Sequence, residues 1–258
     1  MRRLRFALLQ AAHGNENTTR NFRRELDADL VEFDVNSGEL PRSTDGYDAV
    51  VVTGSRASVY WDEEWIDPLV EFIGEAADAG LPVLGVCYGH QAVAEALGGR
   101  VAGMDDFELG YNEIERVNDD PLFDGIDEEF TVFTSHGDHV VDLPPGANLL
   151  ARNDHGIHAF RKGDCWGVQF HPEYDIETAR EIAEDKRERV GDAQVDAVLD
   201  DITPERFDAA CEAKQLFENF TRYVRTQRNR AADTDREADT DREADADRET
   251  DPEPEATA

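Results

Sequence analysis

The stretch that decides the fold is Leu81-Pro-Val-Leu-Gly-Val-Cys-Tyr-Gly-His-Gln-Ala-Val-Ala-Glu-Ala-Leu-Gly-Gly99. Its apolar first part, Leu81–Val86, has the length and composition of a buried strand, and an amphipathic helix follows directly after Cys87. A glycine stands two residues to either side of the cysteine, where a sharp strand-to-helix turn is crowded and its central residue is strained. The pattern predicts that Cys87 projects at the positive end of a helix, which favours a thiolate.

Other short apolar segments on the N-terminal side repeat this strand-like character. They cover Leu4–Ala12, Asp29–Val35 and Tyr47–Thr53. Apolar residues recur at helical spacing in Glu63–Ala79. Short, nearly all-apolar strands separated by helices are typical of a parallel sheet that is covered on both faces. The sequence therefore predicts an α/β fold, a doubly wound and mostly parallel sheet with helices on both faces.

The pattern changes after residue 100, where strand-like segments alternate with turn residues. These segments are Tyr111–Val117, Phe130–Thr134, Ala147–Arg152 and Cys165–Phe170. They predict an antiparallel extension beside the parallel core. Two helices are expected after it, Asp175–Arg189 and Pro204–Arg228.

The charge is strongly negative throughout the chain. Its 258 residues include 59 acidic and 26 basic ones, for a net charge of −33. A nearly exact Ala-Asp-Thr-Asp-Arg-Glu repeat begins near residue 231 and has no large apolar side chain, which predicts a disordered acidic tail over 231–258 and one domain over 1–230. The acidic, lysine-poor composition resembles that of proteins from salt-loving microorganisms, and it argues against nucleic acid as a partner.

The apolar segments and the cysteines indicate in which cellular compartment the protein works. No apolar run approaches the roughly 20 residues that cross a bilayer, so no membrane association is expected. The basic and apolar N-terminus, residues 1–10, is interpreted as a first strand, because its apolar part ends at Gln10 without a cleavage pattern. Three widely spaced cysteines suit a reducing cytoplasm.

A proton shuttle for Cys87 is offered by Gly167-Val-Gln-Phe-His-Pro-Glu-Tyr174. Residues two apart in an extended segment project to the same side, and Pro172 biases His171 away from helix. Glu173 can then orient the imidazole of His171 and stabilise its charged form, while the other ring nitrogen faces the cysteine.

Gly85-Val-Cys-Tyr-Gly-His-Gln91 together with Gln169-Phe-His-Pro-Glu173 resembles the class I, triad-type glutamine amidotransferase family. The resemblance covers residues 4–190, and it implies a flavodoxin-like core with Cys87, His171 and Glu173 as the catalytic triad. It also implies hydrolysis of the γ-amide of glutamine through a γ-glutamyl thioester, with release of ammonia and without a cofactor.

Two further segments match the same family. Val51-Val-Thr-Gly-Ser-Arg-Ala-Ser58 lies where the family has its oxyanion loop, so the resemblance implies an oxyanion hole at the backbone N–H groups of Gly54 and Tyr88. Thr134-Ser-His-Gly-Asp-His-Val140 is similar to the glutaminase domain of GMP synthase. The resemblance thus implies substrate-binding roles for Gln91, Ser135 and His136.

Alternatives to this function remain open. The loop reads Thr-Gly-Ser-Arg rather than the Gly-Gly-Pro-Gly of many members, which is closer to free-standing GMP-synthase-like proteins and to γ-glutamyl peptidases. The partners expected are glutamine or another γ-glutamyl compound, and a separate synthase subunit that accepts ammonia. A hydrolase of γ-glutamyl peptides or amides, and a non-catalytic regulatory module, are the alternatives. The histidines at 136, 139, 155 and 158 are three apart in pairs, but no complete ligand set accompanies them, so no metal is expected.

Overall fold

A computed structural model describes residues 2–12 and 16–230, and within them nine strands form one sheet in the order β2-β1-β3-β4-β9-β8-β7-β5-β6. Five neighbouring strands are parallel: β1 (Arg5–Gln10), β2 (Asp29–Asp34), β3 (Ala49–Val52), β4 (Val83–Val86) and β9 (Cys165–Val168). The antiparallel part comprises β5 (Arg100–Arg116), β6 (Glu129–Asp142), β7 (Asn148–Asn153) and β8 (Gly156–Lys162). The expected parallel core with an antiparallel extension is confirmed.

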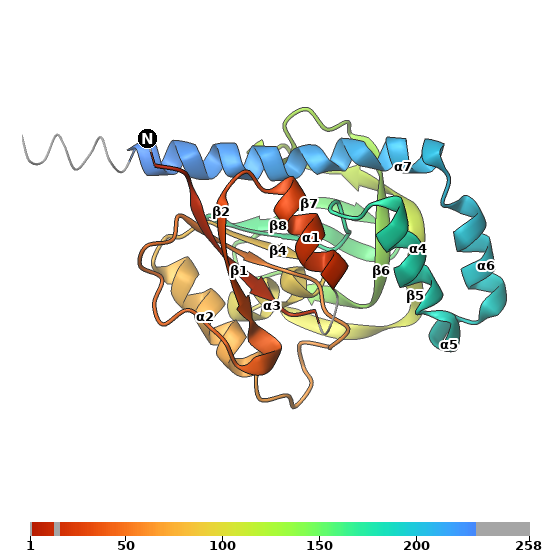
Figure 1. Ribbon diagram of the computed structural model, residues 1–258, viewed down its shortest axis with the longest axis horizontal. Coiled ribbons are helices and arrows are strands. Elements are labelled where there is room, and N and C mark those ends of the chain that lie inside the picture. Colours follow the sequence, from red (N-terminus) through yellow and green to blue (C-terminus); the bar gives the residue numbers. More distant parts are fainter. Residues whose placement is uncertain (1, 13–15, 231–258) are drawn as a thin grey trace, which may run out of the picture.

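Helices follow most of the parallel strands and then close the C-terminal side. They are α1 (Glu16–Glu25), α2 (Ile66–Asp78), α3 (Tyr88–Ala96), α4 (Ile176–Glu184), α5 (Arg187–Val190), α6 (Asp192–Asp201) and α7 (Pro204–Ala210). Short 3₁₀ turns lie at Val35–Ser37, Pro121–Phe123 and Cys211–Lys214. Helix continues over 215–230, and together with α7 it runs along the longest dimension of the molecule (Figure 1).

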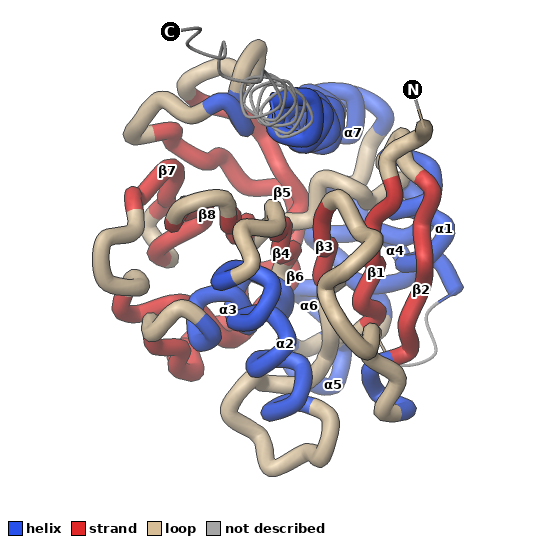
Figure 2. The backbone as a smooth tube through the Cα atoms, turned by 90° about the vertical axis from the view of Figure 1, so that its left-hand side faces the viewer, coloured by secondary structure: helices blue, strands red, loops and turns tan. Residues whose placement is uncertain are grey.

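Helices cover both faces of the parallel strands because each strand is apolar on both sides. Val50 and Val52 of β3 pack in the layer that holds α2 and α3, whereas Val51 packs in the opposite layer with α1 and the 215–230 helix. A third apolar cluster joins α4, α6 and α7 to β5 and β6. Figure 2 shows β2, β1, β3 and β4 side by side, between these helices.

Two expectations about individual elements are corrected, and two elements are added to those predicted. The sequence pattern places Cys165–Phe170 in the antiparallel extension; β9 does pair antiparallel with β8, but on its other side it pairs in parallel with β4, so it joins the extension to the core. The expected helix Asp175–Arg189 is divided into α4 and α5, and α6 follows it. Helix α1, which carries few apolar residues, and strand β8 are the two elements that the sequence analysis does not predict. The predicted acidic tail lies outside the described residues, so its disorder and the domain boundary at residue 230 stay predictions.

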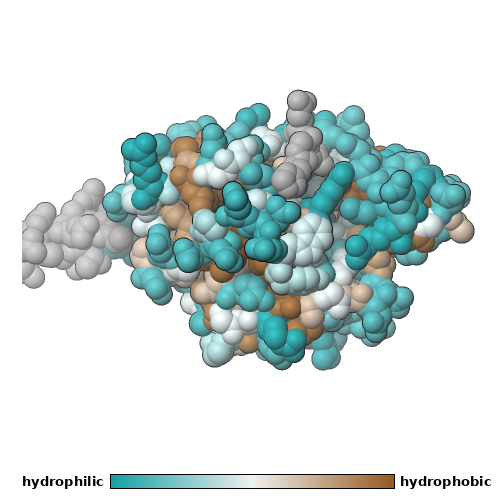
Figure 3. All heavy atoms as spheres, turned by 90° about the horizontal axis from the view of Figure 1, so that it is seen from below, coloured by the Kyte–Doolittle hydropathy of each residue, from teal (hydrophilic) through white to brown (hydrophobic). Residues whose placement is uncertain are grey.

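The surface fits the acidic composition. In Figure 3, hydrophilic residues dominate the face shown, and hydrophobic ones form small patches between them. Among the described residues, no helix combines the length and the apolarity that crossing a bilayer requires.

The 215–230 helix is held to the sheet by aromatic packing, and this predicts its contribution to stability. The ring of Phe220 is fully buried and packs edge-on against Phe6 and Trp166, at centroid distances of 5.9 and 6.0 Å. We expect Phe220→Ala to lower the free energy of unfolding by about 3–5 kcal/mol in urea titrations, because it leaves a cavity between sheet and helix. Glu218→Ala, at an exposed position of the same helix, is the control and should change it by less than about 0.5 kcal/mol. Equal effects of the two substitutions would show that this helix is not part of the cooperative core.

Candidate active site

The site lies at the carboxyl edge of the parallel strands. Because β3, β4 and β9 are parallel neighbours, the residues that follow them meet at one edge of the sheet. Gly54 follows β3, Cys87 follows β4 and His171 follows β9. A methyl group built on Gly54 would lie 3.1 Å from His171 Cε1 and 3.6 Å from Cys87 Cβ, so the three segments are in direct contact.

Cys87 occupies a strained backbone conformation, as its turn predicted. Its φ of 54° makes it the one non-glycine residue with positive φ in the described chain, and its ψ is −103°. A Cβ on Gly85 would lie 2.1 Å from the carbonyl oxygen of Gly89, and a Cβ on Gly89 would lie 2.3 Å from that of Val52. Both glycines are therefore required by close backbone approach. The N–H of Cys87 donates to the carbonyl of Val168 at 2.8 Å, which ties the turn to the end of β9.

His171 and Glu173 form a buried hydrogen-bonded pair. Nδ1 of His171 lies 2.8 Å from Oε1 of Glu173, and the two residues are 5% and 0% exposed. The ring of Tyr174 stacks on the imidazole at a centroid distance of 4.1 Å, and the N–H of His171 donates to the carbonyl of Phe133. These contacts fix the orientation of the ring, and Nε2 lies 3.5 Å from the hydroxyl of Tyr174.

The electrostatics of this pair favour the imidazolium. Burial lowers the pKa of His171, but the adjacent Cys87 and Glu173 outweigh burial and raise it to about 10. The histidine is therefore held in its protonated form at neutral pH, next to the sulfur of Cys87.

The predicted oxyanion donors are placed consistently with their role. Gly54 is in contact with Cys87 and His171, as described above, and lines the same cavity as both. Tyr88 is the first residue of α3, so its N–H has no carbonyl one turn earlier within the helix to bind. Gly54 and Tyr88 thus both lie next to Cys87, and their role as oxyanion donors stays a prediction.

Gln91, Ser135 and His136 all line the hollow beside Cys87, but their side chains have different partners. The Nε2 of Gln91 donates to the carbonyl of Asp138 at 3.0 Å, so part of this amide serves the protein itself. The hydroxyl of Ser135 is buried without a hydrogen-bond partner in the described structure, and its carbonyl oxygen lies 4.0 Å from Cys87 Sγ. Ser135 and Cys87 thus lie next to each other and line the same two hollows.

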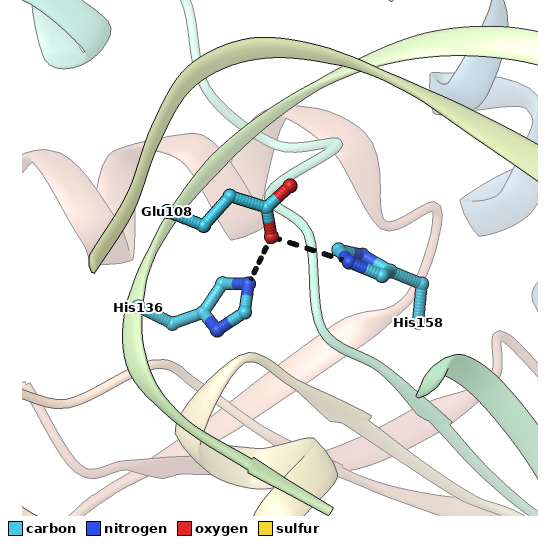
Figure 4. Close-up of side chains that lie close together, drawn as sticks. All are labelled: Glu108, His136 and His158. Atoms are coloured by element: carbon cyan, nitrogen blue, oxygen red, sulfur yellow. Dashed lines mark hydrogen bonds and ion pairs between the residues drawn. The ribbon is translucent and has the colours of Figure 1, made fainter. Parts of the chain in front are cut away.

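His136 belongs to a buried cluster with Glu108 and His158, which converge on one carboxylate oxygen (Figure 4). Oε2 of Glu108 lies 2.6 Å from Nε2 of His136 and 3.2 Å from Nε2 of His158, and Asn153 donates to its Oε1. Two ligands of one tetrahedral zinc ion lie about 3.3 Å apart, so the 2.6 Å contact is that of a direct hydrogen bond. Burial raises the pKa of Glu108, but the hydrogen bonds from the two histidines outweigh it and lower the pKa overall.

This cluster occupies the ring of His136, whose role in substrate binding stays a prediction. Its Nδ1 faces the carbonyl of Asp138 at 3.0 Å, so both ring nitrogens already have protein partners. The ring positions the segment that carries Ser135 rather than offering a free nitrogen to a substrate. The pairing of His136 with His158 could not be read from their separation, since the spacing suggests His155 and His158 as neighbours.

Asp138 fastens the oxyanion loop to β6, and no local sequence pattern indicates this contact. Its carboxylate accepts hydrogen bonds from Ser58 and from Tyr60, the latter at 2.7 Å. Because Ser58 lies four residues after Gly54, this contact restrains the loop that carries the predicted oxyanion donor.

Two hollows meet at Cys87. The first contains His171 and Glu173 and is bordered by Ala12, Tyr174 and Ile182. The second runs between the oxyanion loop and β6, and its lining includes Phe107, Lys186 and Arg189. The sequence does not predict these three as site residues, because they come from β5, from the residue before α5 and from α5 itself.

The fold and the site are those of one class of protein. The sequence model of the family described as "Glutamine amidotransferase class-I" matches residues 13–188 of this chain. The chain belongs to the class I glutamine amidotransferase family. Among curated proteins it is similar to GMP synthase [glutamine-hydrolyzing] of Thermomicrobium roseum, at 40% identity over 146 residues, 56% of this chain and 26% of that protein. The same-named protein of Pyrobaculum aerophilum is 44% identical over 127 residues, 48% of this chain and 24% of that protein. The match thus spans about a quarter of the length of these relatives.

Solved structures show the same fold at lower identity. A glutamine amidotransferase from Thermotoga maritima superposes with a TM-score of 0.71 at 23% identity, over 86% of this chain and 99% of that one. A glutamine amido transferase from Methylobacillus flagellatus gives a TM-score of 0.72 at 20% identity, over 86% of this chain and 95% of that one.

The raised pKa of His171 predicts the pH profile. A raised pKa keeps the proton on the ring at neutral pH, so we expect kcat/KM for amide hydrolysis to fall only as the pH rises through about 10. Glu173→Gln removes one of the two groups that raise this pKa, and it should move the fall towards the ordinary value of 6.5. Glu177→Gln, at an exposed carboxylate of α4, is the control and should leave the profile unchanged. Profiles that coincide for Glu173→Gln and the unmodified protein would contradict the assigned pairing.

Proposed function

We propose that this protein hydrolyses the γ-amide of glutamine with Cys87 as nucleophile, His171 as general acid and base, and Glu173 as the group that orients His171. The observation that carries the proposal is the strained Cys87 turn placed against the buried His171–Glu173 pair. The family to which the chain belongs supports the same chemistry.

The first half of the reaction forms an acyl-enzyme. The thiolate of Cys87 attacks the γ-carbonyl carbon, and the oxygen takes the negative charge between the N–H groups of Gly54 and Tyr88. The C–N bond then breaks as His171 gives its proton to the departing nitrogen, so that ammonia leaves and a γ-glutamyl thioester remains.

The second half returns the enzyme to its starting state. The neutral imidazole of His171 takes a proton from water, and the resulting nucleophile attacks the thioester carbon. The C–S bond breaks, glutamate is released, and Cys87 is again a thiolate beside an imidazolium. Glu173 stabilises the charged ring at both stages, because its carboxylate stays on Nδ1.

Substrate recognition is assigned to the hollow between the oxyanion loop and β6. We infer that Ser135 accepts a hydrogen bond from the α-amino group, because its buried hydroxyl has no partner among the described residues. Gln91 and His136 act mainly by holding the β6 side of this hollow in place, because both contact the carbonyl of Asp138.

A separate synthase subunit is proposed as the acceptor of ammonia. The relatives named GMP synthase are about four times as long as the matched segment, so the synthase part of those proteins lies outside the similarity. We also propose a reducing, cytoplasmic setting and a high-salt one: Cys87, Cys165 and Cys211 are all free thiols, and the net charge of −33 needs screening.

The alternative substrate is a γ-glutamyl peptide or amide. One observation favours keeping it: the loop departs from the Gly-Gly-Pro-Gly sequence of many family members. The triad would act in the same way on both substrates.

Removal of the nucleophile tests the proposed mechanism. Cys87→Ala should lower ammonia release from glutamine by at least about 10³-fold, because no other group can form the thioester. Cys211→Ala, at a half-buried thiol far from the site, serves as the matched control and should retain activity. Circular dichroism should show both variants folded. Undiminished turnover by Cys87→Ala would mean that another residue is the nucleophile.

The two substrate classes are separated by direct competition. If the protein is an ammonia donor, we expect kcat/KM for glutamine to exceed that for γ-glutamyl dipeptides at the same salt concentration. The measurement is glutamate release from each substrate alone and from mixtures. A preference of more than about 10-fold for the dipeptides would assign the chain to the γ-glutamyl hydrolases instead.

A further inference from the structure

Two basic residues lie at the end of the hollow between the oxyanion loop and β6. Lys186 precedes α5 and Arg189 lies within it, and both are positioned over the ring of Phe107, at 5.8 and 5.0 Å from its centroid. Arg189 also packs closely on β6, since a Cβ built on Gly137 would lie 2.4 Å from its Nη2. Both side chains thus border the same hollow as Cys87.

Neither of these cations has an acidic partner. Within the described residues, no ion pair or hydrogen bond joins the side chain of Lys186 or Arg189 to a carboxylate, although the chain carries 59 acidic residues against 26 basic ones. Their neighbour Arg187 shows the usual situation, because it pairs with Glu184, Asp192 and Asp196.

The other charged groups of the hollow are already engaged. Arg56 pairs with Asp185, and the carboxylate of Asp138 accepts from Ser58 and Tyr60. Burial lowers the pKa of Lys186, which shows that its ammonium group is only partly hydrated. An anion that entered the hollow would therefore meet two cations with no counter-charge in direct contact.

The position of His171 decides which part of a substrate occupies this hollow. His171 lines the first hollow and not the second, and the general acid must lie beside the departing nitrogen. The leaving group therefore belongs to the first hollow, and the acyl group extends from Cys87 into the second. In a γ-glutamyl substrate that acyl group ends in an α-amino and an α-carboxylate group.

We propose that Lys186 and Arg189 bind the α-carboxylate of the γ-glutamyl group and make it a requirement for substrate binding. That the bound group is a γ-glutamyl group rests on the proposed function. That the hollow prefers an anion rests on the two cations over Phe107. Ser135, on the opposite wall, then faces the α-amino group. Arg189 provides a planar fork that suits a carboxylate, and Lys186 adds a point charge closer to Cys87.

The test compares L-glutamine with L-glutaminamide, in which an amide replaces the α-carboxylate. Affinities are measured by calorimetry in the Cys87→Ala background, so that neither probe is consumed. We expect glutamine to bind at least about 10-fold more tightly than glutaminamide, and Lys186→Met with Arg189→Met to remove this difference by weakening glutamine alone. Arg187→Met, which removes the same charge from the same short helix, is the matched control and should keep the preference.

Kinetics of otherwise unmodified enzymes separate binding from chemistry. If the pair binds the carboxylate, Arg189→Met should raise KM for glutamine by about 10–100-fold with little change in kcat. A fall in kcat at unchanged KM would instead show that the cations act on the thiolate, and it would overturn the proposal.

The outcomes also distinguish this inference from the proposed function. If the protein binds glutamine through Lys186 and Arg189 but releases no ammonia, the carboxylate-binding role of the two residues stands and the proposed glutamine hydrolysis is refuted. If the protein hydrolyses glutamine, but the Lys186→Met, Arg189→Met variant keeps the full preference for glutamine over glutaminamide, the proposed hydrolysis stands and the carboxylate-binding role is refuted. Failure of both probes to bind to Cys87→Ala would also refute the inference.

Discussion

The parallel pairing of β4 with β9 is the contact on which the rest of the site depends. Gly85 lies opposite Gly167 and Val86 opposite Val168, and the N–H of Cys87 continues this ladder to the carbonyl of Val168. Because the strands run in the same direction, both carboxyl ends reach the same edge. A slip of one residue would turn the side chains of β9 to the opposite faces and move the segment that leads to His171. Two segments far apart in sequence are thereby held in contact.

The strained turn and the buried pair support each other. The positive φ of Cys87 costs of order 1–3 kcal/mol, and it persists because backbone contacts of Gly85 and Gly89 leave no other path for the chain. In the buried pair, burial alone would lower the pKa of His171 and favour the neutral ring, but Cys87 and Glu173 raise that pKa and favour the charged ring. The stability lost at one residue is thus offset by packing and charge pairing around it. A chemically useful arrangement is kept within a densely packed core.

Charge is distributed unevenly between the surface and the site. The chain as a whole is strongly acidic, yet Arg56, Lys186 and Arg189 all border the hollows beside Cys87. Lys186 is half-buried, whereas Arg56 and Arg189 are exposed at the rim of these hollows, where a substrate would enter. The acidic residues nearby are bound to loop hydroxyls or to Arg56, so they do not neutralise the remaining cations. The site is therefore basic within a protein that repels anions elsewhere.

The sequence by itself determined the α/β class, the turn at Cys87 and the pairing of His171 with Glu173, because each depends on residues close together in the chain. Strand composition, glycine spacing and the alternation around Pro172 are local signals. Only the tertiary structure decided that β9 joins the parallel core, that His136 pairs with Glu108 and His158, and that Lys186 and Arg189 reach the hollow. These contacts join β5, β6, β8 and α5, and nothing in a local pattern specifies which distant element packs beside another. Long-range packing, rather than propensity, placed those side chains.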